Sequence, residues 1–141
     1  MSVFSHVSYE TFLPEVIDES FKRLVILDIS AQWCGPCKVL DPIINSVANN
    51  YSAKEVSFVK LEAEDENMKI AGEYAVRGFP TVIAFINGKE SARFHSAQTA
   101  DFVTDFIDEQ LELFSLAWCL IFSSYNLYYV KLYLFLRFNR F

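Results

Sequence analysis

Cysteine is scarce in this sequence: its 141 residues include three, and two of them form the segment Cys34-Gly35-Pro36-Cys37. A small secreted scaffold held together by disulfides needs more cysteine pairs, so that class of protein is excluded. The N-terminus also lacks a basic region followed by an apolar run, so we expect no secretory signal. These two absences favour a reducing, cytoplasmic location.

Basic residues are few in most of the chain. Residues 1–112 carry nine Lys or Arg against eighteen Asp or Glu, whereas residues 113–141 carry three basic residues and no acid. Phosphate binding needs a basic face, and residues 1–112 show no basic stripe with interleaved aromatics, so we expect no nucleic-acid partner. The change in composition predicts a domain over residues 1–112 and a hydrophobic, aromatic-rich tail over residues 113–141.

The hydrophobic pattern predicts an α/β fold with a central mixed β-sheet flanked by helices on both faces. The segment 24–29 is almost continuously apolar, as expected for a strand that is buried on both faces. Asn87-Gly88 is a two-residue hairpin signal, which makes the last two strands antiparallel. Expected strands cover 3–7, 24–29, 56–61, 81–86 and 89–94, and expected helices cover 8–20, 34–50, 67–74 and 99–111. The tail adds a hydrophobic helical extension.

The two cysteines of Cys34-Gly35-Pro36-Cys37 follow a buried strand and open a helix, a context that is typical of redox chemistry. The spacing brings both sulfurs within bonding reach in the first helical turn. Cys34 is predicted to be the attacking thiol, because the positive end of the helix dipole and the free backbone N–H groups stabilise a thiolate there. Cys37, one turn further and expected to be more buried, is predicted to be the resolving thiol.

Two other interpretations of the cysteine pair remain open, namely a structural zinc site and a fold that has kept these residues without their activity. Zinc would need a second Cys or His pair at suitable spacing. Cys119, His6 and His95 do not supply one, so we expect no metal ligands.

Residues 1–112 resemble thioredoxin, and the motif Trp33-Cys34-Gly35-Pro36-Cys37 carries this resemblance. The resemblance implies the thioredoxin fold and a redox-active Cys34–Cys37 disulfide, with no bound cofactor. It also implies that Trp33, Gly35 and Pro36 contact the substrate.

Further positions match this family. Asp28, six residues before Cys34, stands where the family keeps a buried carboxylate, whose raised pKa suits it to accept a proton from Cys37. Lys60 matches the lysine beside that carboxylate. The alternative for Asp28 is a hydrogen-bonded acid with a structural role. The alternative for Lys60 is a solvated lysine at the end of a strand.

Gly78-Phe79-Pro80-Thr81 matches the cis-proline loop of the family. By resemblance, the peptide bond before Pro80 is cis, Pro80 faces the sulfurs, and Phe79 offers backbone groups to an extended substrate strand. An ordinary trans turn proline is the alternative.

Two positions depart from the family pattern. Ser30 stands where the family usually has an aromatic residue, which removes bulk beneath the active-site loop and is expected to alter its redox poise. Ser96 stands where the family tends to have glycine, near the end of the last strand, so partners are expected to dock less closely there.

The resemblance implies a protein disulfide reductase that keeps protein thiols reduced. Its implied partners are disulfide-containing substrate proteins and a thioredoxin reductase, through which NADPH supplies electrons indirectly. Two alternatives remain open: a membrane-associated thiol oxidase or isomerase, and a non-catalytic chaperone or assembly subunit that uses the fold for docking.

The tail allows three interpretations. Residues 113–130 carry no charge, and as a helix they would span about 27 Å, enough for a membrane anchor. The polar segment 123–126 and the basic residues beyond it argue against an anchor on a cytoplasmic domain. A helix packed on the domain or on a partner, and an extension with no evolved role, are the other two interpretations. Cys119 is interpreted as an apolar filler, with a regulatory or dimer-forming thiol as the alternative.

Overall fold

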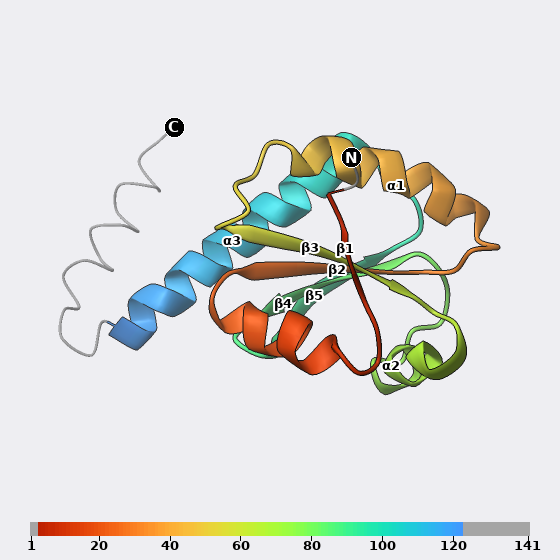
Figure 1. The fold of residues 1–141 in the computed structure, drawn as a ribbon. Helices are drawn as coiled ribbons and strands as arrows, with labels where there is room; N and C mark the ends of the chain where they lie inside the picture. Colours follow the sequence, from red (N-terminus) through yellow and green to blue (C-terminus); the bar gives the residue numbers. More distant parts are fainter. Residues whose placement is uncertain (1–2, 123–141) are drawn as a thin grey trace.

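The computed structural model describes residues 3–122 and places a five-stranded sheet at the centre of the molecule (Figure 1). The strand order is β1-β3-β2-β4-β5. Strands β1, β3 and β2 are parallel, β4 is antiparallel to β2, and β5 is antiparallel to β4, which confirms the expected mixed sheet. The strands are β1 (Ser5–Val7), β2 (Leu24–Ser30), β3 (Val56–Glu62), β4 (Thr81–Ile86) and β5 (Lys89–His95).

The helical segments differ from the expectation at two places. The helix expected over 8–20 is instead a π-helix, η1 (Leu13–Asp18), followed by a 3₁₀ turn, η2 (Glu19–Phe21). Pro14 explains the late start, because proline lacks an N–H and is tolerated in the first turn of a helix. The remaining segments are α1 (Gly35–Ala48), the 3₁₀ turn η3 (Asp65–Asn67), α2 (Met68–Glu73) and α3 (Ala100–Phe122).

The second difference is the length of α3, which runs to Phe122 instead of ending at Leu111. No glycine or proline lies between these residues to end the helix. Position 112, where we placed the domain boundary, therefore lies inside a continuous helix. On this extension the rings of Phe114 and Trp118 contact each other at a tilt, with centroids 6.3 Å apart. Cys119 is exposed, so its interpretation as an apolar filler is wrong.

The interpretations of the tail also concern residues 123–141, which lie outside the described residues. Within residues 3–122, no helix combines the length and the apolar character that a membrane span requires.

Helices cover both faces of the sheet, as expected (Figure 1). Side chains alternate along a strand, so β2 contributes to two separate cores. Leu24 and Ile26 belong to a core shared with α1 and α3, whereas Val25 and Leu27 belong to a core on the opposite face, shared with η1 and α2.

Toward their carboxyl ends, the apolar rows of β2 and β3 on the α1 side become polar. Asp28 and Ser30 follow Leu24 and Ile26 on β2 at the same alternation. In the parallel register, Asp28 pairs with Lys60 and Ser30 pairs with Glu62. Four polar side chains thus gather on the face that α1 covers, near the end of the sheet where α1 begins.

Candidate redox site

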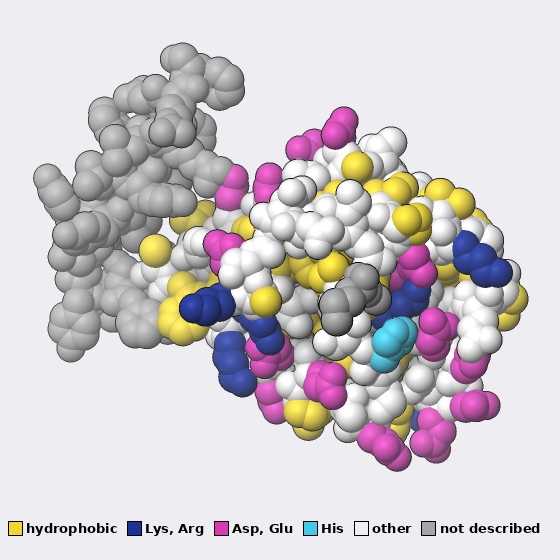
Figure 2. All heavy atoms as spheres, turned by 45° about the horizontal axis from the view of Figure 1, so that its top comes forward, with side chains coloured by type: hydrophobic (Ala, Val, Ile, Leu, Met, Phe, Trp, Pro, Cys, Tyr) yellow, Lys and Arg dark blue, Asp and Glu magenta, His cyan; other side chains and the backbone are white. Residues whose placement is uncertain are grey.

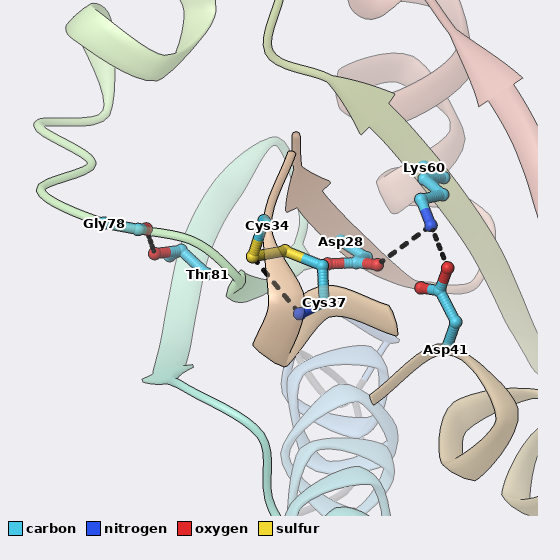
Figure 3. Close-up of a disulfide and its surroundings, with 7 residues drawn as sticks. All are labelled: Asp28, Cys34, Cys37, Asp41, Lys60, Gly78 and Thr81. Atoms are coloured by element: carbon cyan, nitrogen blue, oxygen red, sulfur yellow. Dashed lines mark hydrogen bonds and ion pairs between the residues drawn. A yellow bond between two sulfur atoms is a disulfide. The ribbon is translucent and has the colours of Figure 1, made fainter. Parts of the chain in front are cut away.

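The cysteine pair lies where the chain leaves β2 and enters α1 (Figure 3). Cys34 is the extended residue that caps α1, and its Sγ accepts a hydrogen bond of 3.2 Å from the backbone N–H of Cys37. Cys34 and Cys37 form a disulfide, with Cα atoms 5.3 Å apart. Pro36 lies in the first turn, where its missing N–H leaves no hydrogen bond unmade.

The expected difference in burial between the two cysteines is wrong, because Cys34 and Cys37 are both 3% exposed. Phe79 of the proline loop packs against both of them together with Ala31, and this covers Cys34 as well as Cys37. Trp33, by contrast, is 77% exposed.

The proline loop closes over this site. The Phe79-Pro80 peptide bond is cis, as expected. Phe79 also contacts Trp33 edge-to-face, with ring centroids 5.8 Å apart. The Thr81 hydroxyl donates a hydrogen bond of 2.7 Å to the Gly78 carbonyl, which ties the two ends of the loop together (Figure 3).

Asp28 lies beside Cys37 (Figure 3) and is fully buried. Its carboxylate is 3.9 Å from the Lys60 Nζ, at the outer limit of an ion pair. Neither of its oxygens has a hydrogen-bond partner within the described part of the chain. An ionised carboxylate in such a place is costly, so burial raises the pKa of Asp28 to about 7, against an opposing effect of Lys60.

A second carboxylate, which the sequence analysis missed, holds Lys60 more closely. Asp41 of α1 forms an ion pair of 2.5 Å with the Lys60 Nζ. Figure 3 shows this nitrogen between the carboxylates of Asp28 and Asp41. The negative charges of Asp41 and Glu62 further raise the pKa of Asp28. Helical periodicity could have found Asp41, since it lies four residues after Cys37 and therefore on the same face of α1.

Replacing Asp41 by asparagine is expected to lower the pKa of Asp28 by about one unit. The change removes a nearby negative charge and frees Lys60, now 2.5 Å from Asp41, to pair with Asp28. A ¹³C NMR titration of the Asp28 carboxyl measures this shift.

The control for this titration is Asp18→Asn, which removes an exposed carboxylate at the end of η1, on the opposite face of the sheet. It is expected to leave the Asp28 midpoint in place. An unchanged midpoint in Asp41→Asn would show that Asp41 does not act on Asp28.

The two departures from the family pattern have distinct environments. Ser30 is buried and its hydroxyl has no hydrogen-bond partner among the described residues. Ser96 adopts a φ of +66°, in the left-handed region that glycine adopts most easily, and its N–H donates a 3.1 Å hydrogen bond to the Pro80 carbonyl. The backbone shape at position 96 is therefore one that suits the glycine the family tends to have there.

His6, His95 and Cys119 do not come together as a metal site. Within residues 3–122, no group of three or more His, Cys, Asp or Glu side chains is placed to hold a metal ion.

A disulfide at the start of a helix, under a cis-proline loop and beside a buried acid, is the arrangement of a thiol–disulfide oxidoreductase. Comparison with known proteins agrees with this class. The family model for thioredoxin matches residues 3–109, so the chain belongs to the thioredoxin family.

The similar proteins are thioredoxins of bacteria and chloroplasts. A thioredoxin of Acidithiobacillus ferridurans is 37% identical over 106 residues, which cover 75% of this chain and 94% of that protein. The chloroplastic thioredoxin M2 of Arabidopsis thaliana is 37% identical over 87 residues, covering 62% of this chain and 46% of the relative. The chloroplastic M-type thioredoxin of Brassica napus is 34% identical over 109 residues, covering 72% and 60%. The chain thus spans about half the length of the two chloroplast relatives.

Proposed function

We propose that the chain is a protein disulfide reductase that keeps protein thiols reduced. The observation that carries this proposal is the Cys34–Cys37 disulfide at the start of α1, packed against Phe79 of the cis-proline loop. The family membership and the thioredoxins among its relatives support the same activity.

In the proposed reaction, the Cys34 thiolate attacks one sulfur of a substrate disulfide. A mixed disulfide forms, and the other substrate sulfur leaves as a thiolate that takes a proton from water. Cys37 then loses its proton to Asp28, and the resulting thiolate attacks the Cys34 Sγ. The Cys34–Cys37 disulfide forms, and the second substrate sulfur leaves as a thiolate that takes a proton from water. Two electrons have passed from the dithiol of the protein to the substrate.

Asp28 suits the proton transfer because its pKa of about 7 lies close to the pH at which such a protein works. Lys60 lies 3.9 Å away and would balance the charge that Asp28 gains when it gives up the proton to solvent. We assign Asp28 as the proton acceptor. We assign Lys60 as the neighbouring cation that stabilises the negative charge of the ionised Asp28 carboxylate.

The substrate is proposed to lie across the surface formed by Trp33, Gly35, Pro36, Phe79 and Pro80. Trp33, Gly35 and Pro36 are exposed beside the cysteines, and Phe79 connects this surface to the sulfurs. An extended substrate segment can pair with the backbone of the proline loop.

Continued turnover requires that the disulfide be reduced again. We propose that a thioredoxin reductase does this with electrons from NADPH, and that the protein works in a reducing, cytoplasmic compartment. In this proposal residues 1–112 form the catalytic domain, and the part of the chain after residue 112 takes no part in the chemistry.

The test is reduction of insulin disulfides by the purified chain, with NADPH and a bacterial thioredoxin reductase as the electron source. We expect NADPH oxidation that depends on the chain and on insulin. A parallel assay with dithiothreitol as the reductant separates the two parts of the proposal. If the chain accelerates insulin reduction with dithiothreitol but not with NADPH and the reductase, the proposed reductase partner is contradicted. If it accelerates insulin reduction with neither reductant, the proposed function is contradicted.

A further inference from the structure

A groove of about 640 Å³ adjoins the proline loop on the side of β5. Its lining includes two arginines and a histidine, and no Asp or Glu of the described residues takes part in it. The residues that matter here are Arg77, Phe79, Pro80, Arg93, His95 and Ser96. Phe79 is shared with the redox site, where it packs against Cys34 and Cys37.

The charge of this groove is opposite to that of its surroundings. Residues 1–112 carry twice as many acidic as basic side chains, and Figure 2 shows acidic side chains spread over one face of the molecule. A basic lining on an otherwise acidic domain favours binding of negatively charged partner groups in this groove over positively charged ones.

The two arginines differ in their partners. Arg93 is already neutralised, because its Nε and Nη2 donate to the Glu90 carboxylate at 2.5 and 2.6 Å. Arg77 is exposed and forms no ion pair within residues 3–122. Arg77 is therefore the cation in the groove that can bind an outside anion without first breaking an internal pair.

Two other lining residues, His95 and Ser96, are held to the proline loop by hydrogen bonds. The Thr81 hydroxyl gives its proton to the Gly78 carbonyl, so it must accept from the Nδ1–H of His95, 3.0 Å away. With the proton on Nδ1, the Nε2 of a neutral His95 is an acceptor, so the carboxylate of a substrate is left to Arg77. The N–H of Ser96 donates to the Pro80 carbonyl, which joins Ser96 to the proline loop.

We propose that this groove binds an acidic side chain of the substrate protein, with Arg77 as the residue that determines the preference. The chain would then reduce disulfides that have Asp or Glu near the attacked cysteine faster than otherwise identical disulfides. The inference rests on the proposed reductase function and specifies its substrate class.

The test uses three synthetic peptides that share one intramolecular disulfide and differ only in two flanking residues, which are Glu, Gln or Lys. The measured quantity is kcat/KM for each peptide at low salt, expressed relative to the Gln peptide. We expect the Glu peptide to be preferred about fivefold, the scale of an exposed ion pair, and this preference to weaken as salt is added.

Arg77→Gln is expected to bring the ratio of Glu to Gln peptide close to one, and Arg77→Glu to reverse the preference toward the Lys peptide. The matched control is Lys54→Gln, which removes one exposed positive charge before β3, at the opposite end of the sheet from the cysteines. This control is expected to keep the preference.

A ratio near one in the unaltered chain, or a preference that survives Arg77→Gln, would overturn the proposal while leaving the reductase function intact. Failure to reduce even the Gln peptide would overturn the reductase function, and the proposed preference with it.

Discussion

Cys34→Ser is expected to lower the rate of insulin reduction by more than about 1000-fold, because a serine hydroxyl cannot supply the nucleophile at neutral pH. Cys34 caps α1 and accepts the N–H of Cys37, so the attacking sulfur is placed where a thiolate is stabilised. Serine can make the same cap, so the fold is expected to survive this change.

Cys37→Ser has a different expected outcome. The first attack remains, but no second sulfur is left to resolve the mixed disulfide, so substrate proteins stay covalently bound through Cys34. Non-reducing gel electrophoresis after incubation with a cell extract should show bands that disappear with dithiothreitol, and mass spectrometry should locate the bond at Cys34.

The third cysteine offers a matched control for both changes. Cys119 is exposed on the C-terminal part of α3, so Cys119→Ser is expected to keep full activity and to trap nothing. Trapping through Cys37 in the Cys34→Ser variant, rather than through Cys34 in Cys37→Ser, would reverse the assignment of the two roles.

Asp28→Asn is expected to make the protein more stable at pH 8 but hardly more stable at pH 4. Burial raises the pKa of Asp28 from 3.8 to about 7, so between these values the native state holds a proton that the unfolded chain has released. Stability therefore falls as the pH rises through this range and stays low above it.

The size of this effect follows from the shift in pKa. A shift of three units corresponds to about 4 kcal/mol of unfolding free energy, at 1.36 kcal/mol per unit, and this is an order-of-magnitude figure. Asparagine carries no charge at any pH, so it removes the penalty while keeping the shape of the side chain. The loss of the proton acceptor is expected to slow the release of mixed disulfides in the same variant.

Guanidinium unfolding of the oxidised protein at pH 4, 6 and 8 measures the change. The unaltered chain should lose stability from pH 4 to 8 relative to Asp28→Asn, whereas the exposed-site control Asp18→Asn should follow the unaltered chain. Parallel profiles for Asp28→Asn and the unaltered chain would mean that Asp28 does not titrate with a raised pKa.

The local features of the site could be predicted because each depends on a short stretch of sequence. The cysteine pair follows a buried strand and opens a helix, and the structure shows this arrangement at β2 and α1. The cis peptide bond before Pro80, which the resemblance of Gly78-Phe79-Pro80-Thr81 to the family's loop implied, is present. The almost continuously apolar run of β2 placed Asp28 among buried side chains.

The ion pair between Lys60 and Asp41 could not be predicted from either residue's neighbours. Lys60 lies on β3 and Asp41 on α1, and only the packing of α1 across the sheet brings their charges to 2.5 Å. The equal burial of the two cysteines has the same origin, because Phe79, far along the chain, covers both.

The sequence by itself determined the order of the strands and the two sulfurs, because periodicity, turn signals and the two-residue spacing act over a few residues. Its motifs indicated the family by resemblance. Only the tertiary structure decided which acid holds Lys60, how the proline loop covers the cysteines, and that Arg77 and His95 line one groove. These contacts join residues that are distant in the chain, and their geometry arises from how helices pack on the twisted sheet.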